Sequence, residues 1–81
     1  MTRRMTTNQT IAVLCIGGDW ACAHGDFAGL RDVARKLGAY LPAAIQPELT
    51  AVVEACRRDI DHASELWLRA RNAVMERSFA G

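Results

Sequence analysis

Residues Gly25–Leu41, GDFAGLRDVARKLGAYL, decide the fold, because a stretch of the same pattern, Arg58–Val74, RDIDHASELWLRARNAV, follows 33 residues later. Apolar positions of the two stretches align in pairs: Phe27 with Ile60, Leu30 with Ala63, Val33 with Leu66, Ala34 with Trp67, Leu37 with Ala70, and Leu41 with Val74. A period of about 33–34 residues is the length of one unit of two helices joined by a turn. Such a unit cannot bury its apolar face alone, so we expect two units to stack.

The composition is that of one small globular domain. The chain has 81 residues, of which 51% are apolar and 23% charged, with only two prolines. A core of this size gives marginal stability, which a docking partner would increase. Ten basic and nine acidic residues are mixed along the chain, with a net charge of +1, so no basic patch predicts binding to nucleic acid or to an anionic membrane.

The cysteines and the N-terminus together predict a cytoplasmic protein. Cys15, Cys22 and Cys56 are odd in number and include no CxxC pair, which argues against a disulfide framework and favours a reducing compartment. Basic residues precede an apolar run at residues 11–16, as in a signal peptide, but the run is shorter than the apolar core of one. No other stretch suggests a transmembrane span.

Four helices are expected in a single domain over residues 8–78, between flexible tails at residues 1–7 and 79–81. The helices span about residues 8–23, 27–40, 47–58 and 60–77. The first could instead be a strand, because IAVLCI is apolar and partly β-branched, but a lone strand has no partner here. Of the two adjacent glycines, Gly17 and Gly18, we expect Gly18 to contact a neighbouring helix. Gly25 ends the first helix, and Asp26 and Asp59 cap the second and fourth.

Apolar residues at spacings of three and four define the faces that these helices bury. The second helix buries Phe27, Leu30, Val33, Ala34, Leu37 and Leu41; the third buries Leu49, Val52, Val53 and Cys56; the fourth buries Ile60, Ala63, Trp67, Ala70 and Val74. Leu66, Leu68, Met75 and Phe79 lie outside the innermost stripe of the fourth helix. Self-association or a constant partner is the expected consequence of that extra apolar surface.

The chain resembles two tetratricopeptide repeats over residues 11–75, with units at about 11–42 and 47–75. Gly25-Asp26-Phe27 and Pro42 stand where the second helix of such a repeat opens and ends. The small residue of the repeat's first helix falls on Gly18 and Ala51, and the later unit has Ala63, Trp67 and Ala70 at its small, large and small positions. The resemblance implies an all-α fold of two stacked antiparallel helical hairpins, a fragment of an α-solenoid.

Some residues depart from the repeat pattern and leave an ordinary four-helix bundle as the alternative fold. Leu30 and Leu37 occupy the small positions of the first unit, and Leu14 and Pro47 stand where a tryptophan is usual.

The resemblance also implies a partner-binding groove along the first and third helices. Its ligand-facing positions would be Ala12, Cys15, Asp19, Cys22, Glu48, Val52, Ala55 and Cys56. The clamp by which one subgroup of these repeats holds a C-terminal carboxylate is absent, because Cys15, Asp19 and Glu48 stand at its Lys, Asn and Arg positions. A groove of small apolar residues instead favours an amphipathic helix as the ligand.

No motif predicts an enzyme, a cofactor or a metal. GGDWACAHG lacks the spacing and the lysine of a phosphate-binding loop. Cys22, His24, Cys56 and His62 carry suitable atoms for zinc, but their spacing matches no standard finger, and structural roles are favoured.

These observations predict a small all-α adaptor or chaperone that binds a helical segment of a partner protein. Small repeat-containing chaperones of type III secretion, which shield needle subunits, are an analogy of fold and size, and fold does not fix function. A structural homo-oligomer, or a subunit of a larger assembly, is the second hypothesis. A thiol- or metal-dependent enzyme is the third.

Overall fold

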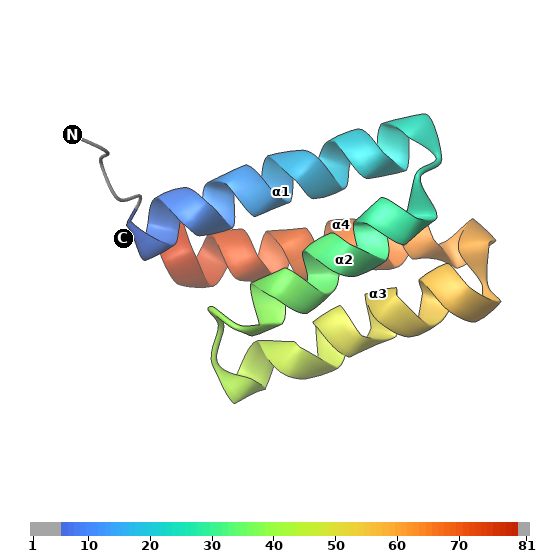
Figure 1. Cartoon of the computed structure of the whole chain (residues 1–81). Coiled ribbons are helices and arrows are strands. Elements are labelled where there is room, and N and C mark those ends of the chain that lie inside the picture. Colours follow the sequence, from blue (N-terminus) through green and yellow to red (C-terminus); the bar gives the residue numbers. More distant parts are fainter. Residues whose placement is uncertain (1–5, 80–81) are drawn as a thin grey trace.

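The computed structural model describes residues 6–79, and their fold is all-α with four helices, as expected (Figure 1). The elements are α1 (Thr7–His24), α2 (Phe27–Gly38), the short 3-10 helix η1 (Ala43–Ile45), α3 (Gln46–Arg58) and α4 (Ile60–Phe79). Thr7 and Phe79, which were expected in the tails, belong to helices. The remainder of the predicted tails, residues 1–5 and 80–81, lies outside the described residues.

Local side-chain chemistry sets the ends of α1 and the start of α2. Thr6 and Gln9 form a capping box, in which each side chain accepts a hydrogen bond from the backbone N–H of the other residue. Gly25 ends α1 with a φ of 70°, the left-handed conformation that glycine adopts without steric cost. Asp26 then caps α2 by accepting a hydrogen bond from the N–H of Gly29 at 3.0 Å. The expected roles of Gly25 and Asp26 are confirmed.

A side chain of α3 holds the link between α2 and α3. Helix α2 ends at Gly38, two residues earlier than expected. The Gln46 amide donates hydrogen bonds to the carbonyl oxygens of Gly38 at 2.8 Å and Leu41 at 3.2 Å. The turn is therefore satisfied by a side chain rather than by a further turn of helix.

Consecutive helices pack against each other in antiparallel directions, and α1 also contacts α4. Figure 1 shows α1 and α3 at opposite edges of the molecule, with α2 and α4 between them, one in front of the other. The four helices therefore enclose one core, in which α1 meets α4 at one edge. The resemblance to tetratricopeptide repeats stays a prediction.

The core contains residues from all four helices and from η1. Its buried apolar members are Ile11, Cys15, Ala21, Leu30, Ala34, Leu37, Ile45, Leu49, Val52, Ala55, Ala63, Trp67, Ala70 and Val74. Three of the aligned pairs, Leu30 with Ala63, Ala34 with Trp67 and Leu37 with Ala70, are buried at both positions. The prediction was wrong for Ile60, which is 51% exposed because it is the first residue of α4 and lies at the edge of the core.

Candidate interaction surface

The junction of α1 with α4 is built on a glycine and a tryptophan. Trp67 has no exposed surface, and its indole ring lies directly against the backbone of α1 at Gly18. A Cβ atom at Gly18 would overlap the ring carbons Cζ2 and Cη2 and would lie 2.7 Å from Cε2. Glycine is therefore required there, because any side chain would separate the two helices. The expected contact at Gly18 is confirmed.

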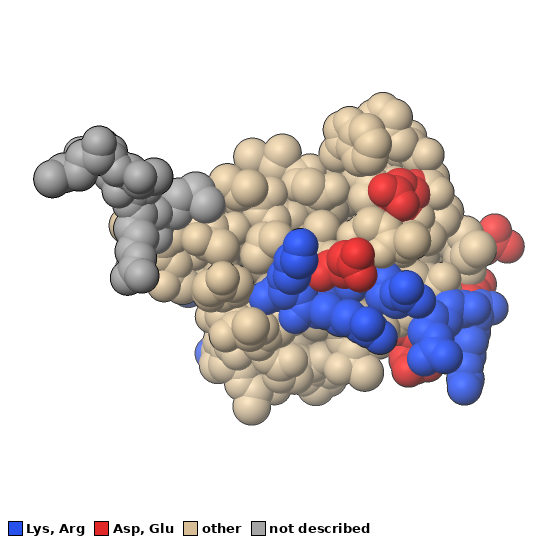
Figure 2. Space-filling view, in the orientation of Figure 1, with Lys and Arg blue, Asp and Glu red and all other residues tan. Residues whose placement is uncertain are grey.

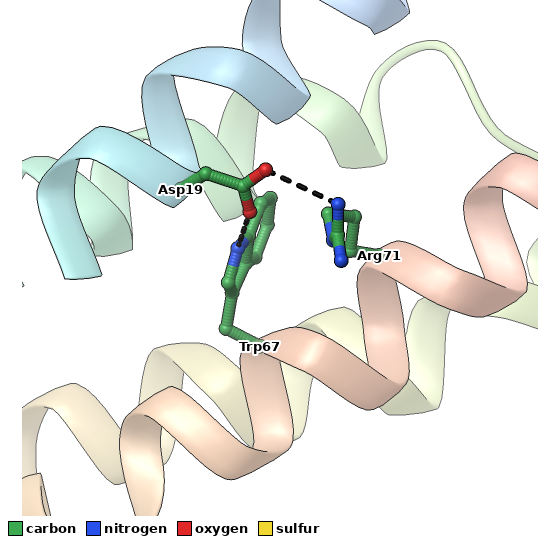
Figure 3. Close-up of polar contacts among 3 residues, drawn as sticks. All are labelled: Asp19, Trp67 and Arg71. Atoms are coloured by element: carbon green, nitrogen blue, oxygen red, sulfur yellow. Dashed lines mark hydrogen bonds and ion pairs between the residues drawn. The ribbon is translucent and has the colours of Figure 1, made fainter. Parts of the chain in front are cut away.

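A carboxylate beside that contact fixes the orientation of the indole (Figure 3). The Trp67 Nε1–H group donates a hydrogen bond to Oδ1 of Asp19 at 2.8 Å, and Nη1 of Arg71 donates to Oδ2 of Asp19 at 3.2 Å. The Asp19 carboxylate thus accepts the hydrogen bond of a buried indole, and its charge, the one Asp, Glu, Lys or Arg charge of α1, is paired with that of Arg71. Asp19, Trp67 and Arg71 form what we call the α1–α4 clamp.

Replacing Asp19 with alanine should lower the free energy of unfolding by about 2 kcal/mol, because a buried indole N–H and a partly buried guanidinium lose their acceptor. Asp19→Asn keeps one carbonyl oxygen for Trp67 and should cost about half as much. Urea unfolding measures both changes. The control is Glu65→Ala, which removes the exposed pair of Glu65 with Arg69 and should cost at most about 0.5 kcal/mol. Equal losses for Asp19→Ala and Glu65→Ala would contradict the clamp.

The outer side of α1, which faces away from this junction, is apolar and exposed. Val13, Ile16 and Trp20 stand at helical spacings of three and four and are 52%, 69% and 55% exposed. We call these three residues the α1 face. The Trp20 ring stacks on His24 with a centroid distance of 4.1 Å, and the His24 ring hydrogen-bonds through Nδ1 to the carbonyl oxygen of Trp20 at 2.9 Å.

The α1 face differs from the rest of the surface in charge as well as in exposure. Helices α2, α3 and α4 each carry at least four charged residues, whereas α1 carries Asp19 alone. Figure 2 shows blue and red atoms gathered over α2 and toward the lower right of the molecule, while the surface over α1 has no blue atoms. Residues 11–18 of α1 are apolar on all sides, and a helical segment of that kind is normally covered on all sides.

Apolar residues of neighbouring helices extend the α1 face on both sides. Tyr40, just after the end of α2, shares a shallow, mostly apolar hollow of about 350 Å³ with Val13, and Lys36 of α2 also lines this hollow. On the other side, Leu68 of α4 lines a hollow of about 380 Å³ together with Ala23 and the three clamp residues. Leu68 is 48% exposed, and Met75, two turns further along α4, is 40% exposed. The exposed apolar surface therefore crosses from α2 over α1 to α4.

Three of the residues predicted to line a groove are in the core instead. Val52 is fully buried, and Cys15 and Ala55 are buried with it. In this fold α1 and α3 lie at opposite edges, so their small residues face α2 and α4 rather than an open groove between them. The prediction of an exposed groove was wrong for these three positions.

The other five predicted residues do not line one groove, although Asp19 and Cys22 border the same hollow between α1 and α4. Asp19 is held in the clamp, and Ala12 is half-buried on α1. Cys22 and Cys56 are half-buried and lie near enough for their charges to interact. Glu48 is exposed in a separate hollow between α3 and α4.

The three thiols are free, and burial raises the pKa of Cys15, Cys22 and Cys56 above the ordinary thiol value. For Cys22 a hydrogen bond with Ser64 opposes the effect of burial on the pKa, and for Cys56 the charge of Arg31 opposes it. The folded protein therefore favours neutral thiols, which are poor nucleophiles and poor metal ligands until they lose a proton.

Stability should consequently fall as the pH rises above about 9, because unfolded thiols ionise there while the folded thiols, with raised pKa values, still hold their protons. Urea unfolding at pH 7, 9 and 10 measures this fall. The variant in which Cys15, Cys22 and Cys56 are all replaced by alanine should lose less stability over the same range. An identical slope in that variant would show that the thiols do not cause the fall.

Between residues 6 and 79 no three His, Cys, Asp or Glu side chains are placed to hold a metal ion. Each helix in that range is too short or too polar to cross a membrane.

Comparisons with protein-family models, with curated proteins and with solved structures found no match to this chain.

Sequence reasoning missed the α1 face because it placed the ligand-facing side of this helix at Ala12, Cys15, Asp19 and Cys22. A signal for it was present: residues 11–18, IAVLCIGG, contain no polar or charged side chain, so this part of the helix has no polar side to face water. The periodicity of α1 could not reveal which apolar residues are exposed, because apolar residues occur all round the helix.

Proposed function

We propose that this chain is a small helical protein-interaction module, without enzymatic activity, that binds another polypeptide through the α1 face. The observation that carries the proposal is a stripe of three large apolar side chains, each more than half exposed, on a helix whose one charged residue, Asp19, is paired with Arg71. Burying such side chains is the main source of affinity in helix-to-helix recognition.

The partner that suits this surface is an amphipathic helix laid along α1. Ridges of side chains at spacings of three and four fit between those of a second helix. Tyr40 on one side and Leu68 on the other would border the bound helix. The sequence also predicted a helical ligand, but in a groove along the first and third helices rather than on the outer side of α1. The free thiols support a cytoplasmic location for the complex.

Site-specific photo-crosslinking in cells tests this function. A photoreactive amino acid at Ile16 should give a covalent adduct with a polypeptide, whereas the same amino acid at Ile60 should give none above background. Ile60 is a matched control, since it is also an exposed isoleucine but lies outside the α1 face. Equal labelling from the two positions, or none from Ile16, would overturn the proposal.

A further inference from the structure

We propose that the helix covering the α1 face is α1 of a second copy of this chain, running antiparallel to the first about a two-fold axis. This inference rests on the proposed function and names the partner for the same surface.

Charge is the first argument for a second copy. A two-fold axis brings each residue of an interface close to the same region of its copy, so any net charge in the interface would repel itself. Val13, Ile16 and Trp20 carry no charge, and the nearby carboxylate of Asp19 is paired with Arg71. Lys36, in the hollow beside Tyr40, lies at the border of the contact. Helices α2, α3 and α4 all carry several charged residues and lack this property.

The order of large and small residues along α1 is the second argument. With the axis between Ile16 and Gly17, close to the middle of the helix, Ile16 lies over Gly17 of the second copy and Trp20 lies over Val13 of the second copy. Each contact occurs twice. In each of these contacts a large side chain packs against a smaller residue, as the side chains of interdigitating helices do.

Gly17 is the third argument, because no contact among the described residues requires a glycine at this position. A Cβ atom at Gly17 would meet only Cγ2 of Val33, at an ordinary contact distance of 3.7 Å. Glycine inside a helix is unfavourable relative to alanine. The close approach of another helix backbone would explain why this half-buried position is glycine. Gly18 is explained in the same way by its contact with the Trp67 ring.

The size of the surface sets the expected strength of the dimer. An 18-residue helix is about 27 Å long and about 10 Å wide. A contact between two α1 helices alone therefore buries less surface on each partner than a standard interface, which buries about 800 Å² per partner. Tyr40 and Leu68 line hollows that border α1 and widen the contact. We expect a dissociation constant on the order of 10 µM, in the range of small interfaces.

Sedimentation equilibrium of the full chain from about 1 µM to about 1 mM, which spans that constant, tests the inference. The unmodified chain should pass from monomer to dimer. Ile16→Glu should raise the dissociation constant at least 100-fold, because it buries two unpaired charges near the axis. Ile60→Glu should leave it unchanged. A monomer throughout the range, or equal effects of the two substitutions, would overturn the inference.

Gly17→Ala separates the interface from the fold. It should raise the dissociation constant about tenfold, since each copy gains a methyl group where the helices approach, without lowering the melting temperature measured at low concentration. An unchanged dissociation constant would contradict the pairing of Ile16 with Gly17.

Oxidative cross-linking tests the antiparallel orientation, in a background with Cys22 and Cys56 replaced by serine and the buried Cys15 retained. Ile16→Cys should give a covalent dimer, because the two copies of residue 16 lie close to the axis. Gln9→Cys should give none, since its two copies would be about 20 Å apart, beyond the reach of a disulfide. Equal cross-linking at both positions would indicate parallel helices and contradict the inference.

The two proposals fail in different ways. A monomeric chain whose residue 16 still cross-links to a different polypeptide in cells would overturn the second copy as partner and keep the proposed function. A monomeric chain with no adduct from residue 16 would overturn both.

Discussion

Replacing Gly18 with alanine is expected to lower the free energy of unfolding by about 3 kcal/mol, at the upper end of overpacking effects. The new methyl group would overlap three carbons of the fully buried Trp67 ring. The ring cannot move aside cheaply, because its Nε1–H group is hydrogen-bonded to Asp19 and its surroundings are packed. Gly18→Val should leave the chain largely unfolded, which circular dichroism with urea titration would show.

The neighbouring glycine provides the control. Gly17→Ala adds the same methyl group one residue earlier, where it meets Val33 at 3.7 Å, and should stabilise the monomer by up to about 1 kcal/mol through helix propensity. Two adjacent substitutions of the same kind should thus change stability in opposite directions. A loss of similar size for both would contradict the placement of Trp67 against Gly18.

Trp67→Ala is expected to cost about 4 kcal/mol, a large part of the stability of an 81-residue domain. The indole is the largest fully buried side chain and contacts α1, so its loss leaves a cavity and leaves Asp19 without one of its donors. Trp67→Phe keeps most of the packing and removes the hydrogen bond, and should cost about 2 kcal/mol. Thermal and urea unfolding at low protein concentration measure both losses.

The second tryptophan is the matched control for this prediction. Trp20 is 55% exposed, so Trp20→Ala should change the stability of the monomer by less than about 1 kcal/mol. The fluorescence of the Trp20→Ala variant, which reports Trp67, should be blue-shifted, and that of the Trp67→Phe variant, which reports Trp20, should be red-shifted. Equal destabilisation by Trp20→Ala and Trp67→Ala would contradict the assignment of one indole to the core and the other to the surface.

Sequence periodicity predicted the all-α class and most of the core because α2, α3 and α4 have one apolar and one polar side. The buried residues Leu30, Leu37 and Val74 follow from spacings of three and four. The turn at Gly25-Asp26 followed from the left-handed cap and the side-chain acceptor that these two residue types supply. The contact of Gly18 followed from the cost of glycine in a helix.

The candidate site was less predictable because it depends on which helices are neighbours. Val52 and Cys15 were expected to line a groove, yet both are buried, since α1 and α3 lie at opposite edges of the molecule. The pairing of Asp19 with Trp67 joins residues 48 positions apart, and no local pattern indicates it. The exposure of Ile16 depends on the same arrangement, because α1 has apolar residues on every side.

Amide and indole NMR spectra of the full chain at about 20 µM and about 1 mM, on either side of the expected dissociation constant, test the central claim most directly. Signals of Val13, Ile16, Gly17 and the Trp20 indole should shift with concentration, together with those of Leu68, while the Trp67 indole and the exposed residues of α3 stay fixed. Shifts centred on α2 or α3, or no shifts at all, would contradict the account of α1 as the surface through which this chain binds its copy.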